Sequence, residues 1–188
     1  MKHILLVATL TVALSATLHA QHDVEAGLNK VPIGYEYMNI PFPPEMLVFK
    51  MDKSKHILKA EGVTLIQVWT MRDGARPELW NRVRDIENTY KGVGLTTISI
   101  NFENGTDFKR QQASLAEFFK SVTQPENFYF DSMGYVADLL AVSGFPLYYL
   151  VDKQGTVIFK TKGEDMEGVD LLESQIKTLL KAGKGMGN

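Results

Sequence analysis

The chain has 188 residues, of which 45% are hydrophobic and 22% are charged, and its formal net charge is −2. These values are typical of one soluble globular domain, and they exclude a disordered chain and a strongly basic nucleic-acid-binding surface. The sequence contains no cysteine, which excludes disulfides, thiolate catalysis, zinc–thiolate sites and iron–sulfur clusters.

Residues 1–20 have the composition of a secretory signal peptide. Lys2 and His3 form a short basic start, residues 4–18 are apolar and uncharged, and Ala20 offers a cleavage edge. This order of regions is typical of an exported protein. The apolar run is shorter than the roughly 20 residues that span a bilayer. We therefore expect cleavage, with no transmembrane anchor left afterwards.

Residues 21–61 form an N-terminal extension. Prolines keep residues 40–44 extended, because proline fixes φ and disfavours helix in the residue before it. A short strand is expected over residues 47–51, and Ile57 and Leu58 are both expected to pack inward. The pattern leaves open whether this extension adds strands to a sheet or wraps around a neighbour.

From residue 62 onward, strand and helix patterns alternate. Runs rich in β-branched and aromatic residues predict strands over 63–69, 95–101, 128–130, 147–151 and 156–162, and apolar residues at helical spacing predict helices over 77–90, 108–122, 135–142 and 169–180. This order predicts an α/β fold, in which helices cover both faces of one sheet. The last two strands form an antiparallel hairpin, so the sheet is mixed. The domain is expected to span residues 62–181, followed by a flexible tail over 182–188.

Three segments carry a resemblance to a known family. Residues 65–69 form a strand that ends in Trp before a turn and a helix, residues 142–146 have the sequence Val-Ser-Gly-Phe-Pro, and residues 150–157 hold a Leu-Val-Asp-x-x-Gly hairpin. Together they resemble the thioredoxin-like superfamily, in particular its exported TlpA/ResA-type proteins. The resemblance implies a three-layer fold with a mixed central β-sheet flanked by helices, and a cis peptide bond before Pro146.

The redox motif of that family is absent. Counted from Trp69, its two cysteines fall on Asp73 and Arg76, so Asp73-Gly74-Ala75-Arg76 replaces the Cys-x-x-Cys turn. Disulfide exchange requires a thiolate that attacks sulfur, which a carboxylate and a guanidinium cannot replace. The family's oxidoreductase activity therefore does not carry over. Pro77 also favours a helix that begins near residue 77 rather than at residue 73.

A polypeptide-binding groove is the candidate site. In the thioredoxin-like fold, the residue before the cis proline presents its backbone N–H and C=O outward, and a bound polypeptide pairs with them as an added strand. The groove implied by this resemblance consists of Trp69, Asp73, Gly74, Ala75, Arg76, Phe145 and Pro146. Two alternatives stay open: Phe145 and Trp69 either line the groove or pack into the core. Trp80 is expected to lie partly off the apolar face of its helix.

These observations favour a redox-inactive protein of the bacterial cell envelope, periplasmic or outer, that binds another polypeptide as a subunit or adaptor. The alternatives are a holdase-type chaperone, and an enzyme that uses Asp73 as a base and Arg76 to hold an anion. No cofactor is expected. No metal site is expected either, because neither His22 nor His56 has carboxylates at a ligand spacing.

Overall fold

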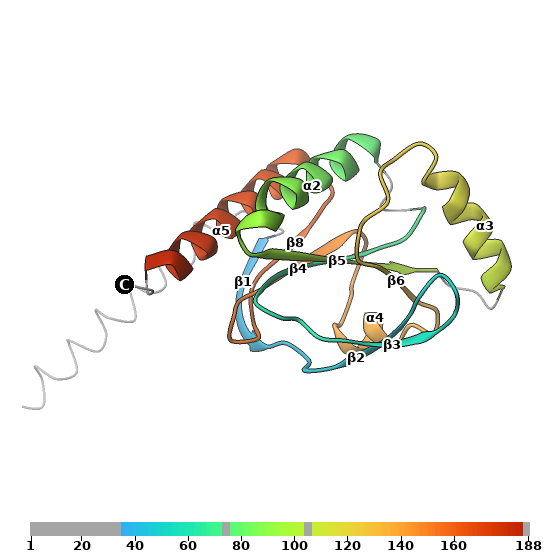
Figure 1. The fold of residues 1–188 in the computed structure, drawn as a ribbon, viewed down its shortest axis with the longest axis horizontal. Coiled ribbons are helices and arrows are strands. Elements are labelled where there is room, and N and C mark those ends of the chain that lie inside the picture. The colour runs from blue at the N-terminus through green and yellow to red at the C-terminus, as the bar shows by residue number, and fades with distance from the viewer. Residues whose placement is uncertain (1–34, 73–75, 104–106, 186–188) are drawn as a thin grey trace, which may run out of the picture. The chain divides into compact units, whose positions relative to one another are not determined.

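The structure is a computed structural model that describes residues 35–72, 76–103 and 107–185 (Figure 1). The signal peptide predicted over residues 1–20 lies outside these ranges. Within them, no helix combines the length and the hydropathy that a membrane span requires.

Eight strands of the described residues form one sheet in the order β1-β8-β7-β4-β5-β6-β2-β3. The strands are β1 (Tyr35–Pro41), β2 (Met46–Phe49), β3 (Lys55–Leu58), β4 (Val63–Trp69), β5 (Leu95–Phe102), β6 (Phe128–Asp131), β7 (Leu147–Val151) and β8 (Thr156–Lys162). The helices are α2 (Pro77–Tyr90), the 3-10 helix η1 (Lys91–Val93), α3 (Phe108–Phe118), α4 (Tyr135–Leu139) and α5 (Met166–Gly185). Strand β5 is parallel to β4 and β6, whereas β7 is antiparallel to β4 and β8. The predicted mixed α/β sheet is confirmed.

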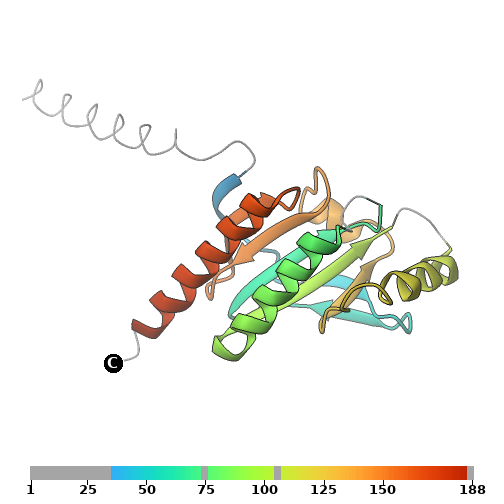
Figure 2. The same ribbon diagram turned by 90° about the horizontal axis from the view of Figure 1, so that it is seen from above.

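Helices lie on both faces of the sheet, as predicted. Helices α2 and α5 lie side by side on one face and run in the same direction, whereas α4 lies on the opposite face (Figures 1 and 2). Leu79, Val83 and Ile86 of α2 and Val169, Leu172 and Ile176 of α5 form one core with the sheet. Their helical spacing places them on one side of each helix. A second core lies beneath the other face and includes Val136 and Leu140.

The N-terminal extension contributes three strands to this sheet. Strand β1 pairs with β8 at one edge, and β2 pairs with β6 and β3 toward the other. Leu58 is buried, as expected, but Ile57 is exposed. The expectation for Ile57 was wrong because successive side chains of a strand point to opposite faces.

Three predicted helix ends differ from the structure. Helix α3 ends at Phe118 and α4 at Leu139, and α4 stops early because Ala141 adopts a positive φ of 47°. Helix α5 continues to Gly185, so residues 182–185, placed in a flexible tail from the sequence, are helical. Glycine costs a helix only about 1 kcal/mol per residue, which a helix packed along the sheet tolerates.

Charged side chains join α2 to α5. Arg82 contacts both Asp170, at 2.9 Å, and Glu173. The Tyr90 hydroxyl donates to Glu173 at 2.7 Å, and the Lys177 ammonium lies 3.1 Å from the same carboxylate. Burial alone would raise the pKa of Glu173, but the hydrogen bonds from Tyr90, Arg82 and Lys177 outweigh it and lower the pKa to about 2. The folded state therefore favours the charged form of Glu173.

This carboxylate predicts acid sensitivity. Its folded pKa lies below its ordinary value of 4.5, so its contribution to stability is present above about pH 4.5 and is lost as the pH falls toward 2. With allowance for solvent screening, we expect Glu173→Gln to lower the free energy of unfolding by about 1–2 kcal/mol at pH 6. Between pH 6 and pH 3, the free energy of unfolding should fall less for the variant than for the wild type. Urea titrations at both values measure this, and parallel losses would contradict it.

Candidate functional site

The candidate site lies where β4 and β5 end and β7 begins. The β4–β7 pairing runs as far as Val68 opposite Leu147, so Phe145 lies beyond the last residue of β4 that could pair with it. The Phe145–Pro146 peptide bond is cis, as the resemblance implied. On the other side of this segment, the Gly163 N–H donates to the Pro146 carbonyl at 3.0 Å. Pro146 is thereby fixed between the ends of two strands.

Phe145 is partly buried, and its side chain belongs in part to the core. Its ring stacks on Phe102 with centroids 5.5 Å apart and planes 16° apart, and it packs against the core beneath α4. The backbone of Phe145, unlike its ring, makes no such contact. No hydrogen bond joins the Phe145 N–H or C=O to any other residue in the described ranges. The ring is therefore held against the core, whereas the two backbone groups have no hydrogen-bond partner among the described residues.

Only glycine fits at position 163, because Tyr148 leaves no room for a side chain there. A Cβ atom added there would lie 2.1 Å from Cε2 of Tyr148, far closer than two carbon atoms approach each other. The ring of Tyr148 and the N–H of Gly163 therefore fix the chain beside Pro146 together. The role of Gly163 could not be predicted from the sequence, because nothing in the local pattern signals a contact with a residue on the neighbouring strand.

Helix α2 begins at Pro77, as predicted, and Arg76 is the residue before it. The Arg76 guanidinium donates to the backbone carbonyl of Glu164 at 2.6 Å, which joins the start of α2 to the loop before α5. Asp73, Gly74 and Ala75 lie outside the described residues. Their place in the groove, and the alternative role of Asp73 as a base, therefore stay predictions.

Asn101 and Glu103 hold the chain after β4. The Met71 N–H donates to Oε1 of Glu103 at 2.6 Å, and Nδ2 of Asn101 donates to the same oxygen at 3.2 Å. Asn101 also donates to the carbonyl of Trp69 at 3.3 Å. Neither residue was predicted as part of the site, although polar residues at the carboxyl end of a buried strand are a usable signal for such a site.

Trp69 does not line a groove. It is 0% exposed and Trp80 is 1% exposed, and their rings lie 4.6 Å apart at 68° in a cluster with Phe118, Phe119 and Phe128. Of the two alternatives for Trp69 the core is confirmed, so its groove assignment was wrong, as was the partial exposure expected for Trp80. Leu115 of α3 also packs in this cluster. The helical pattern of α2 alone does not show that α3 covers Trp80.

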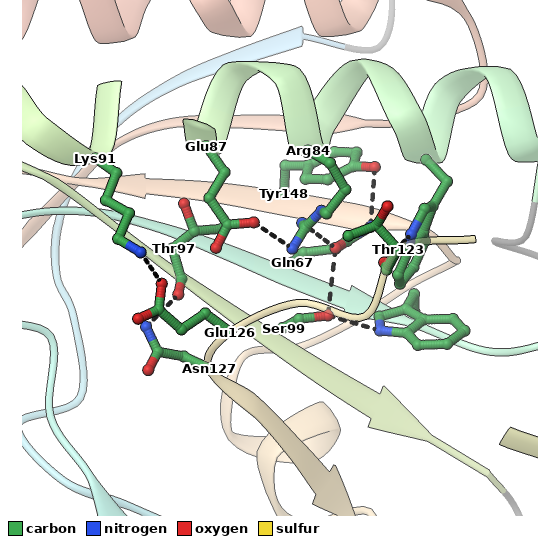
Figure 3. Close-up of polar contacts among 12 residues, drawn as sticks. Gln67, Arg84, Glu87, Lys91, Thr97, Ser99, Thr123, Glu126, Asn127 and Tyr148 are labelled. Atoms are coloured by element: carbon green, nitrogen blue, oxygen red, sulfur yellow. Dashed lines mark hydrogen bonds and ion pairs between the residues drawn. The ribbon is translucent and has the colours of Figure 1, made fainter. Parts of the chain in front are cut away.

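A buried polar layer separates this aromatic cluster from the core under α2 and α5 (Figure 3). Gln67 receives hydrogen bonds from Arg84 at 3.1 Å and Ser99 at 3.3 Å, and donates to the Tyr148 hydroxyl at 3.3 Å. Arg84 also pairs with Glu87 at 2.6 Å. Through Tyr148, which contacts Gly163, this layer reaches the segment that fixes Pro146.

Burial shifts the pKa values of the ionisable groups in this layer. It raises the pKa of Tyr148 to about 12, raises the pKa of Glu87 and lowers that of Arg84, despite the attraction between the last two. Arg84 is only 4% exposed, so its guanidinium meets no solvent-borne ligand. We assign the polar layer to positioning α2 on the sheet.

Comparisons with known proteins place the fold. No family model matches the sequence, and no curated protein matches it. Among solved structures, a protein from Chlorobium tepidum named as the thiol:disulfide interchange protein DsbE has a TM-score of 0.64 at 19% identity, covering 76% of this chain and 97% of its own. A thiol:disulfide interchange protein from a Bacteroides species has a TM-score of 0.57 at 18% identity, covering 80% and 95%. StoA from Bacillus subtilis has a TM-score of 0.55 at 14% identity, covering 72% and 99%.

TM-scores of 0.55 to 0.64 at identities of 14 to 19% show a shared fold. The chain differs from proteins named for thiol chemistry in that it contains no cysteine at all. It has the thioredoxin-like fold without the thiols on which disulfide interchange depends.

Proposed function

We propose that this chain is a redox-inactive thioredoxin-like protein of the bacterial cell envelope that binds an extended segment of another polypeptide at Phe145, as a subunit or adaptor. The observation that carries the proposal is the pair of backbone groups of Phe145. They have no hydrogen-bond partner among the described residues and lie just beyond the end of β4. An extended segment that pairs with them adds a short strand to the sheet.

This mode of binding needs no cysteine. Each backbone hydrogen bond contributes about 0.5–1.5 kcal/mol net, so affinity also requires apolar contact and a segment held in place before binding. Gly163 supports Pro146, and Phe102 supports the ring of Phe145. Such preorganisation lowers the entropic cost of association. Location in the envelope is supported by the composition of residues 1–20.

Phe145→Glu is expected to weaken partner binding at least tenfold, because it places a carboxylate beside the paired backbone groups. Since the ring also stacks on Phe102, the variant should lose about 1–2 kcal/mol of stability as well. Binding is therefore measured at a temperature at which urea titration shows both proteins folded. Val93→Glu is the matched control, because Val93 is exposed and lies in η1. Equal losses of binding in both variants would contradict a site at Phe145.

Stoichiometry distinguishes an adaptor from a holdase. Mild affinity purification from the native envelope, followed by native mass spectrometry, should give one complex of fixed composition. A broad set of substoichiometric clients that exchange with added unfolded protein would instead favour the holdase, which shares the surface but binds weakly and broadly. A monomer that retains neither partner nor client would contradict both functions.

A further inference from the structure

Strand β3 lies at one end of the sheet. Among the residues that the structure describes, it pairs with β2 on one side and is the last strand of the sheet on the other. The strands β4, β5, β6 and β2 lie between it and β7, so this edge is remote from the candidate site. The unpaired backbone groups of an edge strand can accept an added strand. The edge at β3 is therefore a second place at which the sheet can bind a polypeptide.

The pairing of β2 with β3 shows which backbone groups point outward. The Lys50 N–H donates to the Ser54 carbonyl at 2.9 Å, so these two residues form a hydrogen-bonded pair of the antiparallel ladder. Such pairs alternate with pairs that are not hydrogen-bonded, and the register continues regularly along β3. Lys55 and Ile57 therefore direct their N–H and C=O groups away from β2. No hydrogen bond joins these four groups to another residue in the described part of the chain.

The side chains of the same two residues lie on the exposed face of β3. Leu58 is buried in the core beneath α4, and successive side chains of a strand point to opposite faces, so Lys55 and Ile57 point to the other face. Ile57 is 48% exposed and lies opposite Leu47 of β2. Lys55 is exposed too, and within the described ranges no carboxylate pairs with its ammonium. The edge thus presents an apolar and a cationic side chain two residues apart.

A second copy of this chain is a poor occupant of this edge. Residues that lie opposite each other in an antiparallel pair share a face. Two copies of β3 therefore overlap most fully with His56 opposite His56, or with Ile57 opposite Ile57. The first register brings Lys59 of one copy beside Lys53 of the other, and the second brings Lys59 opposite Lys55. Like charges in these positions are destabilising, so the charge of the edge favours a different chain that carries an acidic residue.

We propose that the β3 edge binds an extended segment of a partner protein in which an apolar residue is followed two positions later by an acidic residue. Antiparallel to β3, this segment places its apolar side chain opposite Ile57 and its carboxylate opposite Lys55. The apolar side chain extends the row formed by Leu47 and Ile57, and the carboxylate pairs with the ammonium. The site does not depend on Phe145. A chain that also binds a segment at Phe145 joins two polypeptides.

Four fluorescein-labelled nonapeptides test the order of residues. Each has serine and threonine at the outer positions, and the three central residues are Val-Thr-Asp, Asp-Thr-Val, Val-Thr-Lys or Ser-Thr-Asp. Fluorescence anisotropy with the full chain is expected to rank Val-Thr-Asp first. We expect a loss of roughly fivefold for Val-Thr-Lys, which is the upper range for an exposed ion pair, and of roughly threefold for Ser-Thr-Asp, from the lost cross-strand contact.

N-methylated peptides distinguish strand addition from simple charge attraction. In the Val-Thr-Asp peptide, a methyl group on the valine nitrogen removes the N–H that faces Ile57, and should weaken binding about tenfold. A methyl group on the threonine nitrogen points away from β3, because hydrogen-bonded and non-hydrogen-bonded positions alternate, and should have little effect. Equal losses from the two methyl groups would contradict a paired strand.

Substitutions on the protein give the reciprocal test. Lys55→Glu should reverse the preference, so that Val-Thr-Lys binds better than Val-Thr-Asp, whereas Lys153→Glu in the β7–β8 turn should leave the ranking unchanged. Ile57→Ser should bring Val-Thr-Asp down to the level of Ser-Thr-Asp, and Val93→Ser is the control of similar exposure. All four positions are exposed, so these variants should keep the fold.

NMR spectra of the full chain separate this inference from the proposed function. The Val-Thr-Asp peptide should shift the amide signals of Lys55 and Ile57 and leave that of Phe145 in place. If only the Phe145 signal shifts, the proposed function stands and this inference fails. It also fails if no signal shifts up to millimolar concentration, or if all four peptides bind equally. Concentration-dependent dimerisation that Ile57→Ser abolishes would show that a second copy occupies the edge, which likewise overturns the inference.

Discussion

Replacing Glu87 by alanine is expected to lower the free energy of unfolding by about 3–5 kcal/mol, because it leaves a buried cation without its carboxylate. Arg84 pairs with Glu87 at 2.6 Å beneath α2 and is almost fully enclosed. Its other partner, Gln67, supplies only a neutral oxygen. Urea unfolding followed by circular dichroism measures the loss. A change below 1 kcal/mol would show that the Arg84 guanidinium reaches water when the carboxylate is removed.

Removing both charges should be far less damaging. The pKa values of Arg84 and Glu87 both shift in the direction set by burial, so enclosing the pair costs more than its attraction returns. We therefore expect Arg84→Met with Glu87→Leu to lie within about 1 kcal/mol of the wild type, or above it. Gln67 would still receive a hydrogen bond from Ser99. A double variant as unstable as Glu87→Ala would contradict this balance.

Trp69→Ala is expected to cost about 3–5 kcal/mol, the range measured when a large aromatic side chain is deleted from a core. The ring contacts Trp80 and Phe118, and its Nε1–H donates to Ser99 at 2.9 Å. Trp69→Phe should cost clearly less, because it keeps most of the contact and loses mainly the hydrogen bond. Thermal melts of both variants measure the difference. A Trp69→Ala protein that melts like the wild type but fails to bind its partner would return Trp69 to the groove.

The fold could be predicted where the sequence pattern is local. Strands β4, β7 and β8 have the predicted bounds because each is a short run of β-branched, aromatic and aliphatic residues between turn signals. The start of α2 followed from Pro77. Whether the N-terminal extension adds strands to the sheet could be answered only from the structure, because the pairing of β1 with β8 joins segments more than a hundred residues apart.

In the candidate site too, features that depend on local sequence were predictable and those that depend on distant contacts were not. The motif around Pro146 located Phe145, but its exposure depended on a stack with Phe102 that no local pattern reveals. The sequence left Trp69 between groove and core and placed Trp80 partly outside the core, because it does not show that α3 packs against both. Gly163 and Glu103 escaped notice because their roles consist of contacts with distant parts of the chain. The sequence thus predicted the position of Phe145, and the structure was needed to show that its backbone groups have no hydrogen-bond partner among the described residues.

The central claim is that Phe145 receives a segment of a partner in the cell envelope. A photoreactive phenylalanine analogue at position 145, irradiated in native cells, tests it most directly, with the same analogue at position 93 as the control. The account predicts crosslinks from position 145 to one extended segment of one protein, and none from position 93. The claim would be contradicted if position 145 gave no crosslinks, or if its crosslinks were scattered over as many proteins as those from position 93.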